Sequence, residues 1–434
     1  MRPGPRLLPL ALIWLGLSVL AIVWEPGHAL WLAAGGVAGL VCLTDIWSLY
    51  RMSFPSVSRR MPHSLALGVW SDIGVRLSNA TRMPVTVDVF DHYPTEHAVT
   101  ALPQTQTVPS EGWAEIHYRF FATMRGEHDF HAVQLLMHSP LGLWRRSSLA
   151  LVHDAVRVYP NFSAVAKYAL MATDNRLSQM GVRKRRRRGE GLEFHQLREY
   201  RPGDSLRQVD WKATSRHRKL ISREYQDSRD QQIVFMIDCG RRMTARDDDL
   251  SHFDHTLNSV LLLSYVALRQ GDAVGLMTFS GERRYIAPRK GAGMVNTVLN
   301  GIYDLQPSMQ SPDYASAATE LHKRLRKRSL VVMVTNLRDE DAGEVLPALN
   351  LLGRRHLVLL ASLRESVLTS VLAQPVNDFD DALRLSATQR YLLARRKVHD
   401  AVSKLGAMSL DVEPEKLPIS MVNRYLDIKL SGRL

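Results

Sequence analysis

Hydrophobic and polar positions follow three patterns along the chain, and each predicts a different kind of structure. The first pattern is a pair of uncharged or nearly uncharged apolar runs, residues 7–24 and 29–50, which a break at residues 25–28 separates. Each run is long enough to cross the hydrocarbon core of a bilayer as a helix. Only Asp45 interrupts the second run. We therefore expect residues 1–50 to form a two-helix transmembrane hairpin.

The charges that flank this hairpin predict its orientation. Basic residues stand before and after the pair, and the break between the runs has none: Arg2, Arg6, Arg51, Arg59 and Arg60. Cytoplasmic flanks carry an excess of Lys and Arg, so both ends of the hairpin and everything after residue 51 are expected in the cytoplasm of a multi-pass inner-membrane protein. A cleaved signal peptide is the alternative for the first run, but no clear small-x-small cleavage site follows and a second run comes at once.

The second pattern has period two and covers residues 51–160. Val85, Val87 and Val89 alternate with polar or aromatic positions, and residues 114–120 repeat the alternation. Short alternating strands between turns that bear Pro and Gly predict a small antiparallel β-sandwich. Five of the eight histidines in this region raise the alternative of a metal site, although their spacing fits no ligand motif: His92, His97, His117, His128 and His131.

The third pattern, over residues 231–434, alternates apolar runs with amphipathic stretches. The strands are expected at residues 233–237, 273–279, 330–335 and 357–361. The helices are expected at residues 252–269, 294–305, 314–325, 342–352 and 383–405, before a final strand and helix. This alternation predicts an α/β domain with a mostly parallel, Rossmann-like sheet covered on both faces. Ligands of such sheets bind beyond the carboxyl ends of the strands, where Asp238 lies.

Residues 161–230 form a basic connector between the two β-containing regions. The chain has a formal net charge of +13, and residues 181–230 alone carry 15 basic and 8 acidic residues, a net +7. The unbroken run from Arg183 to Arg188 could bind nucleic acid, but no aromatic residues are interleaved with it. A solvated loop close to an anionic membrane surface is the favoured interpretation.

Residues 191–225, the signature segment, combine charges of alternating sign with aromatic rings. Its pattern is too irregular for an amphipathic helix or a plain strand, and Pro202-Gly203-Asp204 predicts a tight turn. One interpretation is an ordered loop that caps a core through internal ion pairs. The other is a docking surface that the ion pairs hold in one shape.

The same segment is similar to a family of bacterial and archaeal proteins, domain of unknown function 58. The similarity is carried by Glu193-Phe194, Leu197 to Tyr200, Pro202 to Asp204, Arg207, Asp210-Trp211, Thr214 and Arg216, and by the flanking motifs Arg125-Gly126, Ser139 to Trp144 and Tyr159-Pro160. The resemblance implies a membrane-anchored protein with a von Willebrand A-like domain, often encoded beside a MoxR-type AAA+ ATPase. The residues expected to build or form a partner surface are Arg198, Tyr200, Gly203, Asp204, Arg207, Asp210, Trp211 and Arg216.

The resemblance to von Willebrand A domains also implies a divalent-cation site, which this chain has largely lost. The expected Asp-x-Ser-x-Ser loop reads Asp238-Cys239-Gly240-Arg241-Arg242. The expected Thr is replaced by Pro312, beside Asp313, and the expected Asp by Asn336. Hard cations prefer carboxylate and hydroxyl oxygens, so we expect Asp238 to pair with Arg241 or Arg242 and no metal or other cofactor to bind. A weak site made with Asp313, Thr335 and Asn336 is the alternative.

These features favour a non-enzymatic, membrane-tethered adaptor that docks a protein partner. The resemblance suggests that the partner is a MoxR-type ATPase and that the role is complex maturation. Truncation of Trp211 is expected to destabilise the protein through lost packing. A hydrolase is the first rival, with Cys239 near Asp238 as a nucleophile, although no motif for a zinc hydrolase, serine hydrolase or phosphate loop occurs. Nucleic-acid binding through Arg183 to Arg188 is the second. The two cysteines rule out a disulfide framework.

Overall fold

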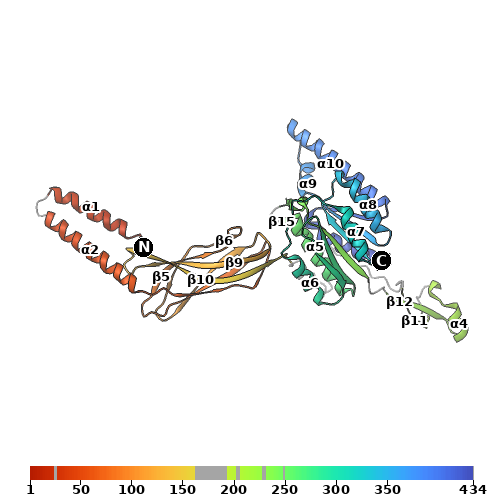
Figure 1. Ribbon diagram of the computed structural model, residues 1–434, viewed down its shortest axis with the longest axis horizontal. Helices are drawn as coiled ribbons and strands as arrows, with labels where there is room; N and C mark the ends of the chain where they lie inside the picture. Colours follow the sequence, from red (N-terminus) through yellow and green to blue (C-terminus); the bar gives the residue numbers. More distant parts are fainter. Residues whose placement is uncertain (24–26, 162–192, 202–205, 227–230, 248–249, 434) are drawn as a thin grey trace. The chain divides into compact units, whose positions relative to one another are not determined.

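The computed structural model describes residues 1–23, 27–161, 193–201, 206–226, 231–247 and 250–433. The chain divides into two compact units, Met1–Tyr159 and Pro160–Leu434. The first contains two apolar helices and a pair of β-sheets, and the second contains a β-hairpin with a short helix and a six-stranded α/β sheet (Figure 1).

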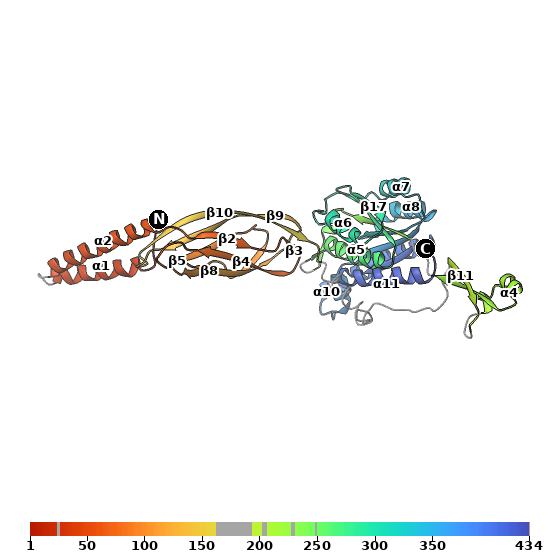
Figure 2. The same ribbon diagram turned by 90° about the horizontal axis from the view of Figure 1, so that it is seen from below.

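Two apolar helices open the first unit, α1 (Leu7–Val23) and α2 (Gly27–Arg51), and they lie side by side (Figure 1, Figure 2). The Trp14 and Trp31 rings stack between them with centroids 5.0 Å apart. Among the described residues α2 is the helix whose length and composition suit a membrane crossing, and α1 is a shorter apolar helix. An apolar amino-terminal helix of this kind indicates membrane association. The double crossing and its orientation stay predictions.

The strands of the first unit form two sheets. The first sheet has the order β1 (Arg2–Pro3), β10 (Trp144–Tyr159), β9 (Gly126–His138), β5 (Val85–His92) and β7 (Gln104–Val108), with β3 (Ser64–Ala66) parallel to β10. The second has the order β2 (Ser56–Arg60), β4 (Trp70–Ser78), β8 (Trp113–Phe121) and β6 (Ala98–Thr100). The ring centroids of Phe120 in β8 and Phe130 in β9 lie 5.5 Å apart, so the two sheets pack together there. Val85, Val87 and Val89 are fully buried, as the period-two pattern predicts.

A loop of the first sheet anchors the helices. The Asp45 carboxylate of α2 accepts hydrogen bonds from Ser139 Oγ at 2.5 Å, from Leu141 N at 3.0 Å and from Leu143 N at 3.3 Å. Gly4 N, just before α1, donates to Leu143 O at 2.7 Å. The start of α1 and the end of α2 are therefore held by the same loop. An acidic residue is tolerated in an apolar helix here because its oxygens have partners.

The second unit contains a six-stranded sheet that is parallel except at one edge. Its order is β17 (Tyr285–Arg289), β16 (Ala273–Phe279), β13 (Gln232–Asp238), β18 (Leu330–Thr335), β19 (Leu357–Leu363) and β20 (Met408–Val412), with β17 antiparallel to β16. Ile233, Phe235 and Ile237 pack with α5 (His252–Arg269), α6 (Gly293–Ile302) and α11 (Leu417–Leu430). Val234 and Met236 pack on the opposite face with α7 (Tyr314–Arg324), α8 (Ala342–Gly353) and α10 (Phe379–Lys404).

The alternation of strands and helices predicts this sheet well, and the differences have local causes. The edge strand β17 is not predicted, because it is short and carries Pro288, which only an edge strand accommodates easily. Helix α10 begins at Phe379 rather than near residue 383, since Asp378 caps it by accepting from Asp381 N at 2.7 Å. Helix α9 (Ser366–Ala373) is also not predicted. The finer assignment to a von Willebrand A-like domain stays a prediction.

Candidate functional site

The described part of the signature segment is more regular than its sequence suggests. Strands β11 (Glu193–Glu199) and β12 (Ile221–Gln226) pair antiparallel, with an irregularity between Phe194 and Gln196. A single 3-10 turn, η2 (Leu206–Gln208), and the short helix α4 (Trp211–His217) lie between the strands in sequence. The expectation of an irregular segment without strand or helix is therefore wrong. Some of the charges pair within the segment, Lys219 with Glu199 at 3.0 Å and Arg223 with Asp210 at 2.8 Å.

Asp210 connects α4 to β12. Its Oδ1 accepts from the backbone N–H groups of Lys212 and Ala213, both at 3.0 Å, and its Oδ2 accepts from Arg223 Nε at 2.8 Å. The hydrogen bond from Ala213 and the nearby Arg223 guanidinium hold the pKa of Asp210 below its usual range. Asp210 is thus an N-cap that fixes where the helix begins.

Trp211 begins α4 and projects into solvent. Its side chain is 64% exposed, and Leu206 in the preceding turn is 70% exposed. This exposure contradicts the expectation that Trp211 stabilises the protein through packing, because little of the residue is buried. A large aromatic group held in an exposed position on an ordered frame is typical of an interaction surface.

The other predicted residues of the signature segment have different positions. Tyr200 is half-buried and its N–H donates to Leu220 O at 2.9 Å, while Arg198 donates to Glu199 O at 3.1 Å. Arg216 is exposed in the last turn of α4. Gly203, Asp204, the Arg207 side chain and the basic run from Arg183 to Arg188 lie outside the described residues.

Asp238 lies at the carboxyl end of β13, as predicted, and is fully buried. Its Oδ2 accepts from Thr335 Oγ1 at 2.6 Å, and its Oδ1 accepts from Gly240 N at 2.8 Å. Tyr314 Oη lies 3.1 Å from the same Thr335 hydroxyl. Burial raises the pKa of Asp238 above its usual value, although the hydrogen bond from Thr335 opposes this effect. Burial therefore makes this carboxyl group harder to ionise than an exposed aspartate.

The arginines beside Asp238 have other partners. Arg242 forms close ion pairs with Asp341 and Glu340, which follow β18 in the chain. No hydrogen bond or ion pair between Asp238 and Arg241 or Arg242 is present in the described structure. The predicted pairing of Asp238 with one of them is therefore wrong. Two acidic residues that are 98 and 99 positions further along the chain compete successfully for Arg242.

The other remnants of a cation site do not form a ligand set. Asp313 is exposed and caps α7, accepting from Ser316 N at 2.9 Å. The Asn336 amide donates to Glu365 Oε1 at 2.9 Å. Gly240 is required by close packing, because a Cβ there would lie 2.9 Å from Gln310 O. Among the described residues, no three His, Cys, Asp or Glu side chains are grouped to hold a metal ion.

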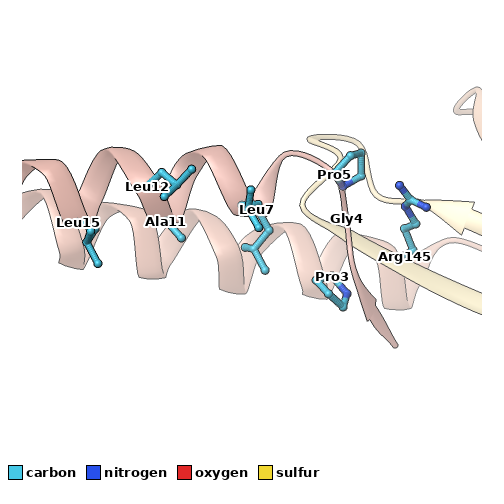
Figure 3. Close-up of a pocket in the computed structure, with 9 residues that line it drawn as sticks. Pro3, Gly4, Pro5, Leu7, Ala11, Leu12, Leu15 and Arg145 are labelled. Carbon is cyan, nitrogen blue, oxygen red and sulfur yellow. The ribbon is translucent and has the colours of Figure 1, made fainter.

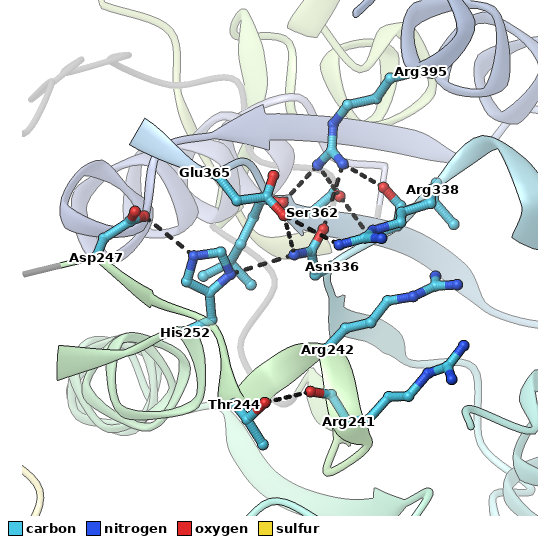
Figure 4. A network of polar contacts seen from close by, with 12 residues as sticks. Arg241, Arg242, Thr244, Asp247, His252, Asn336, Arg338, Ser362, Glu365 and Arg395 are labelled. Carbon is cyan, nitrogen blue, oxygen red and sulfur yellow. Dashed lines mark hydrogen bonds and ion pairs between the residues drawn. The ribbon is translucent and has the colours of Figure 1, made fainter. Parts of the chain in front are cut away.

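A polar network that the sequence analysis missed lies along the same edge of the sheet (Figure 4). His252 is buried at the start of α5, with Nε2 3.1 Å from Asp247 Oδ2 and Nδ1 3.4 Å from Asn336 Nδ2. These partners place the imidazole proton on Nε2. Arg395 of α10 enters from the other side and is 1% exposed. No local sequence signal could have grouped these residues, because they come from four separate segments.

Arg395 ties the ends of three strands together. Its guanidinium donates to Asp411 Oδ1 of β20 at 3.0 Å, to Ser362 Oγ of β19 at 2.6 Å and to Leu363 O at 2.6 Å. It also forms a short hydrogen bond to Leu337 O, just after β18. The Arg395 guanidinium therefore makes structural hydrogen bonds at the edge of the sheet where ligands of α/β sheets usually bind.

Cys239, the candidate nucleophile, is also buried. It has no exposed surface, and its Sγ lies 3.8 Å from Ile237 O. A thiol enclosed in this way is not presented to a substrate.

Comparisons with known proteins find the expected family. A family model described as protein of unknown function DUF58 matches residues 196–405. The chain is 23% identical over 260 residues to "Uncharacterized protein YeaD" of Bacillus subtilis (strain 168). That match spans 58% of this chain and 60% of the relative's length.

Similarities to solved structures are weak. An aerotolerance-related membrane protein from Bacteroides fragilis NCTC 9343 has a TM-score of 0.30 and 13% identity, covering 45% of this chain and 98% of that one. The CARDB domain of PF1109 from Pyrococcus furiosus has a TM-score of 0.18 and 12% identity, covering 25% and 97%. These TM-scores are too low to bear on fold or function. The family match, by contrast, confirms for residues 196–405 the resemblance to DUF58 that the sequence predicts.

Proposed function

We propose that the protein is a membrane-attached, non-enzymatic adaptor whose signature segment docks a protein partner. The observation that carries this proposal is the exposed Trp211 at the start of a helix that Asp210 caps, with a second exposed apolar residue, Leu206, in the preceding turn. Trp and Arg side chains contribute most to binding energy in protein interfaces. The basic residues around Trp211, including Lys212 and Arg216, favour a partner with an acidic surface.

The partner suggested by the family resemblance is a MoxR-type AAA+ ATPase, and the role is chaperone-like maturation of a membrane complex. The proposed setting is the cytoplasmic face of the inner membrane. In support of this, Asp45 and Gly4 hold both helices to the same loop, so a hairpin that crosses twice would return to the side where it began. The basic flanks at Arg2, Arg6 and Arg51 favour the cytoplasmic side.

The α/β unit favours a binding function over catalysis. Asp238 is enclosed by donors and Cys239 is buried, so neither group is presented to a substrate. Arg395 is held by backbone and side-chain acceptors. These groups serve to hold the sheet together.

A crosslinking pull-down from native membranes tests the proposal. Wild type, Trp211→Ala and Trp113→Ala are compared, since Trp113 is 55% exposed but lies in β8, outside the signature segment. We expect an AAA+ ATPase to be enriched with wild type and Trp113→Ala and to be lost with Trp211→Ala. Equal melting temperatures of the three proteins show that folding is not the cause. Retention of the ATPase by Trp211→Ala, or enrichment of no ATPase by wild type, contradicts the proposal.

A further inference from the structure

A groove of about 560 Å³ runs along one side of α1 in the first unit (Figure 3). One face of the helix lines it, with apolar side chains that repeat at helical spacing: Leu7, Leu8, Ala11, Leu12 and Leu15. The segment before the helix and Arg145 of β10 close one end. Its volume lies within the range of about 300–1,000 Å³ that is usual for small-molecule sites. The groove is therefore apolar along its length and cationic at one end.

Two arginines are register partners at the end of the groove that Arg145 lines. Strand β1 pairs antiparallel with β10 so that Arg2 is the direct partner of Arg145. Directly opposed residues of an antiparallel pair project to the same side of the sheet, and like charges in these positions repel each other. This pairing therefore brings two positive charges together beside the groove.

The local acidic groups leave this charge incompletely balanced. Among the described residues, Asp88 is the carboxylate that pairs with Arg145, at 3.9 Å. Asp88 already accepts from Thr105 Oγ1 at 2.7 Å and lies 2.9 Å from His138 Nε2. Arg145 Nε is buried and has no hydrogen-bond partner within the described structure. The Arg145 side chain is still 27% exposed, and its carboxylate contact is no closer than 3.9 Å, so an anion could bind to the accessible part of the guanidinium.

The end of the groove is built rather than incidental. Gly4 N donates to Leu143 O, which fixes β1 against the start of β10. A Cβ at Gly4 would lie 2.2 Å from Gly142 O, so only glycine allows this approach. The positions of Arg2 and Arg145 are consequently set by the backbone before any ligand binds.

We propose that this groove binds an anionic phospholipid, with one acyl chain along α1 and the phosphate between Arg2 and Arg145. The membrane association that α2 indicates supplies the source of the lipid. Charge complementarity selects the headgroup, because anionic lipids are attracted to basic residues at the membrane surface. A free phosphate would satisfy the arginines but would leave the apolar face of α1 unused. This inference concerns the first unit and does not depend on the docking of a protein by the signature segment.

Native mass spectrometry of the full chain in neutral detergent tests the proposal with phosphatidylglycerol, phosphatidylcholine and glycerol 3-phosphate as probes. We expect wild type to retain phosphatidylglycerol at least tenfold better than phosphatidylcholine and to bind no glycerol 3-phosphate. Arg145→Gln should reduce phosphatidylglycerol retention about tenfold. Arg157→Gln is the matched control, because Arg157 lies on the same strand near its other end, beside Glu127. It should behave as wild type does.

Equal retention of the two lipids, equal effects of the two substitutions, or binding of glycerol 3-phosphate alone would each overturn the proposal. A second measurement does not depend on lipid retention. Because Arg2 and Arg145 repel each other when no anion is bound, Arg2→Gln should raise the melting temperature in neutral detergent and shrink the further rise that phosphatidylglycerol causes. A lower melting temperature of lipid-free Arg2→Gln contradicts the inferred repulsion.

Discussion

Replacement of Arg395 by Met should destabilise the α/β unit strongly while leaving the volume of the side chain nearly unchanged. The guanidinium donates to Asp411, Ser362, Leu363 O and Leu337 O, and the residue is 1% exposed. Methionine keeps the apolar stem but leaves these buried acceptors without a donor. Hydrogen bonds to a charged group contribute about 1.5–3 kcal/mol each, and part of this is recovered where water can enter.

The expected loss is about 4 kcal/mol of unfolding free energy, within the range of about 3–5 kcal/mol that follows removal of one partner from a buried ion pair. Since each 1.4 kcal/mol is a factor of ten, exchange of the most protected sheet amides should accelerate about a thousandfold. Hydrogen exchange with mass spectrometry measures this at Leu330–Thr335 and Leu357–Leu363, the strands that Arg395 connects. The effect should be largest where the lost acceptors lie.

Arg396→Met is the matched control, because Arg396 is the next residue of α10 and is exposed. It should change exchange of these strands by less than about threefold, as surface substitutions usually cost no more than about 0.5 kcal/mol. The reasoning is refuted if the two substitutions have similar effects, or if Arg395→Met accelerates exchange less than about tenfold. Either result would mean that solvent or neighbouring donors replace the guanidinium at little cost.

Two further predictions concern pH. Burial raises the pKa of Asp238, so the fold is more stable when this carboxyl is protonated, and that contribution falls as pH rises from about 4 towards neutrality. In urea titrations, Asp238→Asn should flatten this part of the curve of unfolding free energy against pH. An unchanged slope contradicts the prediction. Burial and the charge of His128 lower the pKa of His97 to about 4, so stability of the sandwich should be lost as pH falls from about 6.5 through that value. His97→Gln should remove this loss in tryptophan-monitored melting, whereas the exposed His117→Gln should keep it; equal profiles for the two variants exclude the assignment.

The local pattern of the chain is enough to predict most of its elements. Residues 273–279 and 330–335 are all apolar or nearly so because both faces of their sheet are covered, and the structure has β16 and β18 at these positions. Helix α5 has the predicted bounds His252–Arg269 because Ser251 and Asp254 form a capping box at its start. Asp238 ends β13 as predicted. These features are local, so residues within one or two turns decide them.

The partners of the polar side chains are decided by the tertiary structure. Asp45 interrupts an apolar run in the sequence, but its role depends on the loop at Ser139, 94 residues away. Arg242 turns to Asp341 rather than to its neighbour Asp238, and Arg395 reaches three strands from a helix. Trp211 has a large, mostly apolar side chain of the kind that usually packs in a core, but it is exposed. The sequence by itself determines which segments become strands, helices and apolar membrane segments, since hydrophobic burial depends on periodicity. Only the tertiary structure decides which charges meet, because hydrogen bonds require particular atoms to come within about 3 Å and distant segments supply them.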